Sequence, residues 1–299
     1  MAHAASAVEL PAPSAIAELF KPITWFPPMW AFACGVVASG QSLEGRWGLV
    51  LAGVLLAGPF VCATSQAVND WFDRHVDAIN EPHRPIPSGR MPGRWGLYLA
   101  LIWTVLSLLL STTLGPWGFG AAALGLVLAW AYSAPPVRLK RNGWWGNAAC
   151  GLSYEGLAWI TGAAVMAGGQ MPAVPSMILA LLYSLGAHGI MTLNDFKAIE
   201  GDRKMGIASL PVQLGARGAA WVACATMVLA QAAVVACLLA WSRPWHAGAV
   251  ALCVAVQLLM MRRFLAKPVA RALWLSGLGV PLYVAGMMIS AFALRAGVQ

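Results

Sequence analysis

Residues 69–89 read NDWFDRHVDAINEPHRPIPSG, and they directly follow an uncharged run, residues 49–68, long enough to cross a membrane. Asp70, Asp73 and Asp77 have the i, i+3, i+7 spacing that places three side chains on one face of a helix. Their negative charges repel one another and the negative end of the helix dipole. We therefore expect a cation among them. Oxygen ligands favour Mg²⁺, which shares its shell with substrate phosphate.

Residues 194–203, NDFKAIEGDR, repeat this arrangement further along the chain. Asp195 and Asp202 are again seven residues apart, two helical turns. All five aspartates of the chain lie in the two stretches. A solvated helix end explains a single aspartate equally well, but two clusters with the same spacing favour a shared metal site.

The composition indicates a membrane protein of helical class. The chain has 299 residues, of which 60% are hydrophobic and only 10% charged, with a mean hydropathy of +0.70. The net charge of +8 comes without a basic helix or an aromatic-basic module, so we expect no nucleic-acid partner. Six cysteines are scattered through apolar runs without ligand spacing, which predicts neither disulfides nor zinc.

The apolar runs predict an all-α polytopic membrane protein, a bundle of nine transmembrane helices with a cytoplasmic active-site cap. We expect residues 20–299 to form this single domain and residues 1–19 to be a cytoplasmic tail, since they lack a basic segment and a signal-peptidase site. The runs are residues 23–40, 49–68, 96–114, 118–133, 145–167, 174 into the second aspartate stretch, 219–241, 245–261 and 272–294.

The basic residues predict how the chain is oriented. All but three of the 19 lysines and arginines fall in loops on one side of this arrangement, and the exceptions are Arg46, Arg243 and Arg295. The positive-inside rule then places the N-terminus and both aspartate stretches in the cytoplasm and the C-terminus in the periplasm, in a multi-pass protein of the inner membrane. Both aspartate stretches leave the bilayer at the same face, where they can face each other.

Two facing carboxylate clusters suit a diphosphate, because magnesium ions bridge its oxygens and neutralise a leaving group. An isoprenoid tail would lie among the apolar helices. Arg84, Lys140 and Arg203 are candidates for charge-assisted hydrogen bonds to phosphate, although each by itself is better explained as a surface cation that sets topology. The suggested reaction is transfer of a prenyl group.

Longer segments carry a resemblance to a known family. Residues 69–89, 130–140 (WAYSAPPVRLK) and 192–202 (TLNDFKAIEGD) resemble the chlorophyll and bacteriochlorophyll synthase group of the UbiA-type intramembrane prenyltransferases, and residues 21–28 and 154–159 are most similar to the bacteriochlorophyll branch. The resemblance covers about residues 20–295. It implies nine transmembrane helices, Mg²⁺ as cofactor, and a magnesium and diphosphate site at the following residues: Asn69, Asp70, Asp73 and Asp77, with Asp195 and Asp202 at the second metal.

The second stretch departs from the pattern of some members, which carry another acid three residues after the first aspartate. Ala198 occupies that position here and Lys197 precedes it, so Glu200 is the candidate substitute. The further substrate-binding candidates are Tyr132, Glu155 and His188, of which the last two are polar residues within apolar runs. A lone histidine on an apolar helix, such as His188, is more often a hydrogen-bonded packing residue than a ligand.

The resemblance implies that geranylgeranyl or phytyl diphosphate is joined to the propionate of bacteriochlorophyllide a, a late step of bacteriochlorophyll biosynthesis. A propionate with a pKa of about 4 to 5 is already ionised in the cytoplasm. No protein base is then needed, in keeping with a sequence that shows no His-centred dyad. Besides these substrates and the bilayer, pigment-biosynthesis or assembly proteins are expected partners.

Three alternatives stay open from the sequence. A related prenyltransferase acting on chlorophyllide, a quinone precursor or haem changes only the acceptor. A divalent-cation transporter would use the aspartates as ion ligands, although transport sites usually lie at the membrane midplane. A pigment-binding assembly protein without catalysis would tolerate Asp70→Asn.

Overall fold

The computed structural model describes residues 9–296. In it, the three aspartates of the first stretch lie on one uninterrupted helical rod from Trp47 to Asn80. The rod consists of α3 (Trp47–Leu55), a π-helical segment η2 (Leu56–Cys62) and α4 (Ala63–Asn80). Pro59 lies in the π-helical segment. A proline lacks the N–H of a regular helical turn and clashes with the preceding turn, and the widened segment accommodates it. The helix therefore continues through the aspartates, as expected.

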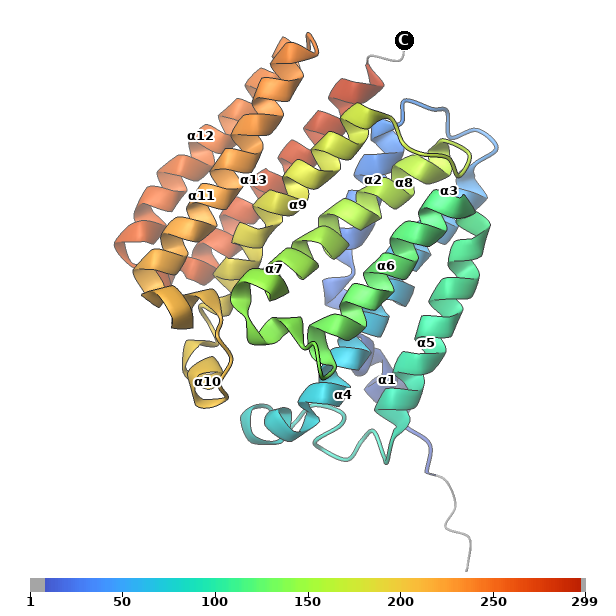
Figure 1. Ribbon diagram of the computed structural model, residues 1–299, viewed down its shortest axis with the longest axis vertical. Coiled ribbons are helices and arrows are strands. Elements are labelled where there is room, and N and C mark those ends of the chain that lie inside the picture. The colour runs from blue at the N-terminus through green and yellow to red at the C-terminus, as the bar shows by residue number, and fades with distance from the viewer. Residues whose placement is uncertain (1–8, 297–299) are drawn as a thin grey trace, which may run out of the picture.

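The rest of residues 9–296 consists of further helices joined by loops, without a strand (Figure 1). The expected all-α class is confirmed. The remaining elements are α1 (Pro13–Phe20), η1 (Pro22–Thr24), α2 (Phe26–Ala38), α5 (Trp95–Ser111), η3 (Thr112–Leu114), α6 (Gly115–Ser133), η4 (Leu139–Arg141), α7 (Gly143–Gly151), η5 (Leu152–Leu157), α8 (Ala158–Met166), α9 (Val174–Asp195), α10 (Ile199–Lys204), α11 (Leu210–Ala240), α12 (Pro244–Ala266) and α13 (Pro268–Arg295).

Six helical stretches within residues 9–296 are long and apolar enough to cross a membrane. They are Trp47–Asn80, Trp95–Ser133, Val174–Asp195, Leu210–Ala240, Pro244–Ala266 and Pro268–Arg295. The second of these folds back at Gly115, whose φ of +78° is a conformation that favours glycine, so that α5 and α6 pack side by side. The chain is thus a multi-pass membrane protein, and the nine crossings stay a prediction.

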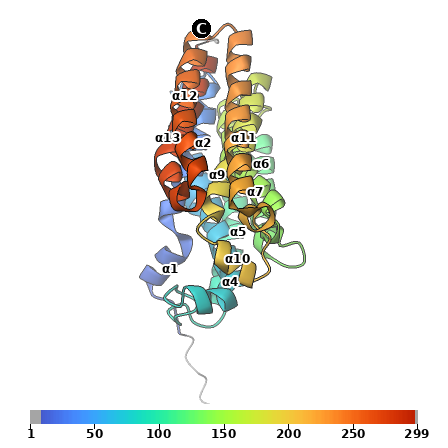
Figure 2. The same cartoon turned by 90° about the vertical axis from the view of Figure 1, so that its left-hand side faces the viewer.

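The short helices and polar loops gather at one end of the bundle, opposite the end of α13 (Figures 1 and 2). They are α1, α10, the loop at residues 81–94 and the η4 loop. The expected N-terminal tail is integrated with the bundle over its described part, since α1 packs on α4 and buries Leu19 and Phe20. Apolar burial explains why this segment is ordered against the bundle. Residues 1–8 lie outside the described part of the chain.

Close helix contacts fix the rod formed by α7, η5 and α8. Gly35 of α2 lies against the Trp159 carbonyl of α8, and Gly162 of α8 lies against the Phe32 carbonyl of α2, with no room for a Cβ at either position. Small residues let two membrane helices approach in this way. The rod therefore has a fixed position between α2 and α9, on which it also packs.

Candidate active site

Asp70 is almost fully buried on α4, with 2% of its surface exposed. Its Oδ1 accepts a hydrogen bond from Lys21 Nζ at 2.6 Å and a longer one from Arg84 Nη1 at 3.4 Å. Its Oδ2 has no partner within residues 9–296. A buried carboxylate with an unused oxygen retains capacity for a further cation or donor.

Cations also surround the other two aspartates of the first stretch. Asp73 accepts from Lys140 Nζ at 2.5 Å, from Arg138 Nη2 at 3.2 Å and from Asn69 Nδ2 at 3.1 Å. Asp77 accepts from Arg84 Nη1 at 2.9 Å. Positive charge therefore does lie among the aspartates, as electrostatics requires, but the chain's own side chains supply it.

Two of these cations, Lys21 and Arg138, were not among the residues that sequence reasoning assigned to the site. They are 49 and 65 residues from their carboxylate partners, a separation at which no local pattern indicates pairing. Both have the left-handed backbone, with φ of +47° and +40°. Burial lowers the pKa of the Lys140 ammonium, an effect opposed by the Asp73 charge.

The second aspartate stretch has different neighbours. Asp195, at the end of α9, accepts a hydrogen bond from Asn147 Nδ2 at 3.0 Å, and neither it nor Asp202 has an ion-pair partner within residues 9–296. Burial raises the pKa of the Asp202 carboxyl on α10. Lys197, Glu200 and Arg203, which the sequence suggested as binding residues, have exposed side chains.

The two aspartate stretches meet at the same end of the bundle (Figure 1). Asn80, the last residue of α4, donates from Nδ2 to Met205 Sδ at 3.5 Å, just beyond α10. The Gly143 N–H donates to the Ala208 carbonyl at 2.8 Å, which ties the η4 loop to the second stretch. The chain thus places both clusters and the Arg138–Arg141 cations at one end.

A cavity of about 570 Å³ runs from this end into the bundle. Its polar lining includes residues of both stretches, namely Asn69, Asn194, Asp195 and Lys197, together with Gln66, Tyr132 and Asn147. Its interior is lined by apolar residues such as Leu56, Ala122, Leu128 and Val284. An apolar cavity with a few polar groups at one end is typical of a site for an amphipathic ligand.

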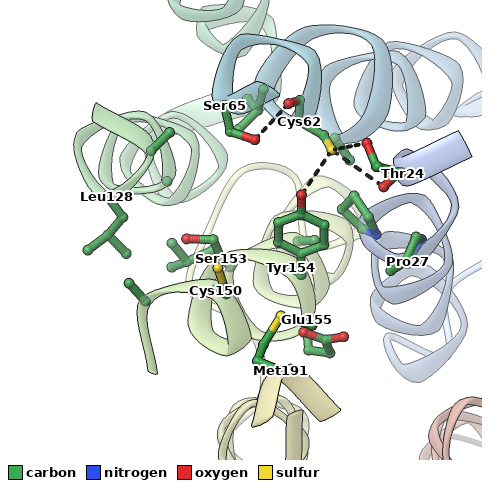
Figure 3. A pocket seen from close by; sticks show the side chains of 18 of the residues that line it. Thr24, Pro27, Cys62, Ser65, Leu128, Cys150, Ser153, Tyr154, Glu155 and Met191 are labelled. Carbon is green, nitrogen blue, oxygen red and sulfur yellow. Dashed lines mark hydrogen bonds between the residues drawn. The ribbon is translucent and has the colours of Figure 1, made fainter. Parts of the chain in front are cut away.

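Both π-helical segments face this cavity, which Figure 3 shows at close range. Cys62 of η2 and Tyr154 of η5 are joined by a hydrogen bond of 3.4 Å, and Gln66 Nε2 donates to the Tyr154 hydroxyl at 3.1 Å. Segments of this kind are frequent at functional sites. Sequence reasoning missed Gln66 and Asn147, since an amide within an apolar run carries no distinctive motif.

The two polar candidates within apolar runs have different positions. Glu155 lines the cavity and is buried, and its Oε2 has no hydrogen-bond partner within residues 9–296. His188 is not among the lining residues. Its Nε2 lies 3.3 Å from the Trp144 carbonyl, and its ring lies 5.7 Å from that of Trp144. The structure thus brings Glu155, but not His188, to the cavity.

The oxygen donors of the two stretches are of the kind that Mg²⁺ accepts. Within residues 9–296, Asp70 Oδ2 has no hydrogen-bond partner and the Asp195 carboxylate has no ion-pair partner. Within residues 9–296, however, no three metal-ligating side chains converge in a metal-binding geometry. The residues fit the ion by chemistry. For Mg²⁺ to bind several carboxylates of the first stretch at once, the basic side chains now paired with these carboxylates would need to change partners.

Comparison with known proteins agrees with this architecture. Residues 25–278 match the UbiA prenyltransferase family. The chain belongs to this family. It is therefore a prenyl-transferring membrane enzyme, as the sequence predicts.

Relatives of this UbiA-family enzyme include two proteins named bacteriochlorophyll synthase 33 kDa chain. The one from Cereibacter sphaeroides is 57% identical over 96% of this chain and 94% of its own length. The one from Rhodobacter capsulatus is 56% identical over 96% of this chain and 95% of its own length. A chloroplastic chlorophyll synthase from Arabidopsis thaliana is 38% identical over 92% of this chain and 73% of its own length. The resemblance to this group is confirmed.

Solved structures share the fold of the UbiA-family chain. A UbiA homolog from Archaeoglobus fulgidus, solved bound to GPP and Mg²⁺, superposes with a TM-score of 0.71 at 20% identity and covers 94% of this chain and 99% of its own. A digeranylgeranylglyceryl phosphate synthase structure has a TM-score of 0.73 at 23% identity and covers 93% and 98%. These likenesses establish the fold.

Proposed function

We propose that this enzyme esterifies the propionate of bacteriochlorophyllide a with geranylgeranyl or phytyl diphosphate and releases diphosphate. The observation that carries the proposal is the cavity, whose polar end includes Asn69 and Asp195 and whose interior is apolar. A prenyl diphosphate has the same division into a charged head and an apolar tail. The bacteriochlorophyll synthases at 56–57% identity support the choice of acceptor.

The aspartate stretches would hold the diphosphate through Mg²⁺, which on binding neutralises charge on the leaving group. The proposed ligands and contacts are Asn69, Asp70, Asp73 and Asp77 on one side and Asp195 and Asp202 on the other. Lys21, Arg84, Arg138 and Lys140 already lie at the first stretch, within hydrogen-bond distance of its carboxylates. They are positioned to donate instead to phosphate oxygens, where charge-assisted hydrogen bonds are strong.

The acceptor needs positioning rather than activation. An ionised propionate oxygen forms a bond to the first carbon of the prenyl group as the bond from that carbon to diphosphate breaks. The cavity lies between helices and its interior is apolar, which keeps competing water from the allylic carbon. The chain's contribution is therefore to hold the two reactants in register and to exclude water.

The membrane arrangement that suits this reaction has nine crossings in a single domain, residues 20–299, with the polar end as a cytoplasmic cap. The distribution of Lys and Arg supports a cytoplasmic N-terminus and a periplasmic C-terminus at the inner membrane. Water-soluble diphosphate would then leave directly into the cytoplasm.

The test uses detergent-solubilised protein, bacteriochlorophyllide a, geranylgeranyl diphosphate and Mg²⁺. We expect an apolar pigment ester, separated by reversed-phase chromatography, that disappears with a chelator and in Asp70→Asn. Glu44→Gln is the matched control, because Glu44 lies in an exposed turn outside the aspartate stretches. Ester formation that persists in both treatments would contradict the metal site. Metal flux into vesicles without any ester would favour a transporter.

A further inference from the structure

Glu155 carries the buried side-chain oxygen of its helical rod that has no hydrogen-bond partner in the part of the chain that the structure describes. Only 7% of its surface is exposed, it lines the cavity, and its Oε2 has no partner within residues 9–296. In Figure 3, a dashed line joins Cys62 to the neighbouring Tyr154 hydroxyl but none reaches the Glu155 carboxyl group. No ion pair within the described residues includes Glu155.

Three other polar side chains of this region are hydrogen-bonded within the protein. Tyr154 is bonded to Gln66 and Cys62. The Thr161 hydroxyl donates to the Leu157 carbonyl at 2.7 Å, and the Ser184 hydroxyl donates to the Ala180 carbonyl at 2.8 Å. An unpaired buried carboxyl is costly, and an ionisable group at such a place in a membrane protein indicates function. Its unsatisfied oxygen indicates that a ligand supplies the partner.

The chemistry of that partner follows from the surroundings. An isolated carboxylate in an apolar cavity without a cation is strongly disfavoured, so the neutral acid is the stable form. A neutral carboxylic acid has an O–H to donate. The ligand group is therefore an acceptor, such as a carbonyl oxygen, and an isoprenoid tail carries none.

The position of Glu155 suits contact with the rim of an acceptor pigment held in the cavity. Glu155 is eight residues beyond Asn147 on the same rod, about 12 Å at the rise of a helix. Asn147 in turn holds Asp195 at the diphosphate end. An acceptor bound in this cavity with its propionate at that end would extend its macrocycle toward Glu155. Bacteriochlorophyllide a carries an acetyl group on its rim where chlorophyllide carries a vinyl group, and only the acetyl group accepts a hydrogen bond.

We infer that Glu155 is a specificity residue that donates a hydrogen bond to the rim acetyl carbonyl of the pigment and so selects it over its vinyl counterpart. This inference rests on the proposed function. The vinyl group would leave the donor buried and unpaired, which is how a polar site rejects an analogue that lacks the matching group.

The experiment measures pigment binding to the full-length protein by fluorescence titration, without diphosphate or added metal. The probes are bacteriochlorophyllide a and the analogue in which vinyl replaces acetyl. We expect the wild type to prefer the acetyl pigment by about tenfold, the effect of one hydrogen bond in a buried site. Glu155→Met, similar in size but without a donor, is expected to lower the preference to about onefold. Glu155→Gln keeps an N–H donor and should retain it.

Thr161→Val is the matched control, because Thr161 also lines the cavity but uses its hydroxyl within the helix. It should keep the preference of the wild type. An unchanged preference in Glu155→Met, or equal binding of the two pigments by the wild type, would overturn the inference. Failure of the proposed function gives a different result, since the wild type would then bind neither pigment. Binding of geranylgeranyl diphosphate with Mg²⁺ checks that each variant is folded. If Glu155→Met does not fold, Glu155→Ala takes its place.

Discussion

The two aspartate stretches share a spacing but not an environment. Asp70, Asp73 and Asp77 on α4 are ion-paired with four basic side chains from the α1–η1 junction, the 81–94 loop and the η4 region. Asp195 and Asp202 form no ion pair within residues 9–296. The partner of Asp195 is a neutral amide, that of Asn147.

The spacing of the first stretch fixes where its carboxylates lie on α4 but not what neutralises them. In the second stretch the expected two turns of one helix are wrong, because Asp195 ends α9 and Asp202 lies on α10 beyond a non-helical turn. The cations at the first stretch come from segments up to 67 residues away in the chain. At the second stretch, the basic side chains that are adjacent in sequence, Arg203 and Lys204, are exposed to solvent. Three comparisons of paired variants test whether this contrast matters for function and stability.

The largest effect is expected from removing a carboxylate in either stretch. Asp70→Asn and Asp195→Asn should each lower kcat/KM for ester formation by about a thousandfold, because each removes a metal-binding oxygen near the leaving group. Initial rates at saturating Mg²⁺ measure this, with Glu44→Gln as the unaffected control. A loss confined to Asp70→Asn would mean that the second stretch does not serve the metal.

Removing a basic side chain that is paired with the first stretch is expected to have an intermediate effect, on stability. Arg84 donates to Asp77 at 2.9 Å, to Asp70 at 3.4 Å and to Glu81 at 2.6 Å. Arg84→Met should lower the free energy of unfolding by about 2 kcal/mol, because it leaves the buried Asp77 carboxylate without its counter-charge. Arg203→Met, at an exposed position, should change it by less than about 0.5 kcal/mol. Thermal unfolding in detergent compares the two, and equal shifts would remove the contrast between the stretches.

The smallest effect is expected from the neutral partner of the second stretch. Asn147→Leu removes the hydrogen bond to Asp195 and should weaken binding of geranylgeranyl diphosphate with Mg²⁺ by about five- to tenfold. Isothermal titration calorimetry measures this affinity. The control is Asn80→Ala, since the exposed Asn80 side chain hydrogen-bonds only to Met205 Sδ within residues 9–296. Unaltered affinity in Asn147→Leu would show that Asp195 needs no orienting amide.

Much of the fold follows from local sequence. The uncharged run before Asn69 and the i, i+3, i+7 aspartates predict one long helix, and the rod from Trp47 to Asn80 confirms it. The turn expected at residues 115–118 is also present, at Gly115. These features depend on hydrophobicity and on backbone conformation, which neighbouring residues determine. The packing of α1 on α4 was not predicted, because the apolar face of this eight-residue helix becomes informative only beside its partner.

The sequence by itself determined the membrane class, the family resemblance and the two aspartate stretches, because periodicity, charge and motif spacing are local properties. Only the tertiary structure decided that Lys21 and Arg138 neutralise the first stretch, that Asn147 holds Asp195, and that Glu155 rather than His188 faces the cavity. Ion pairs and cavities form between segments that are distant in the chain. Their partners are set by how helices pack, which no single stretch of sequence encodes.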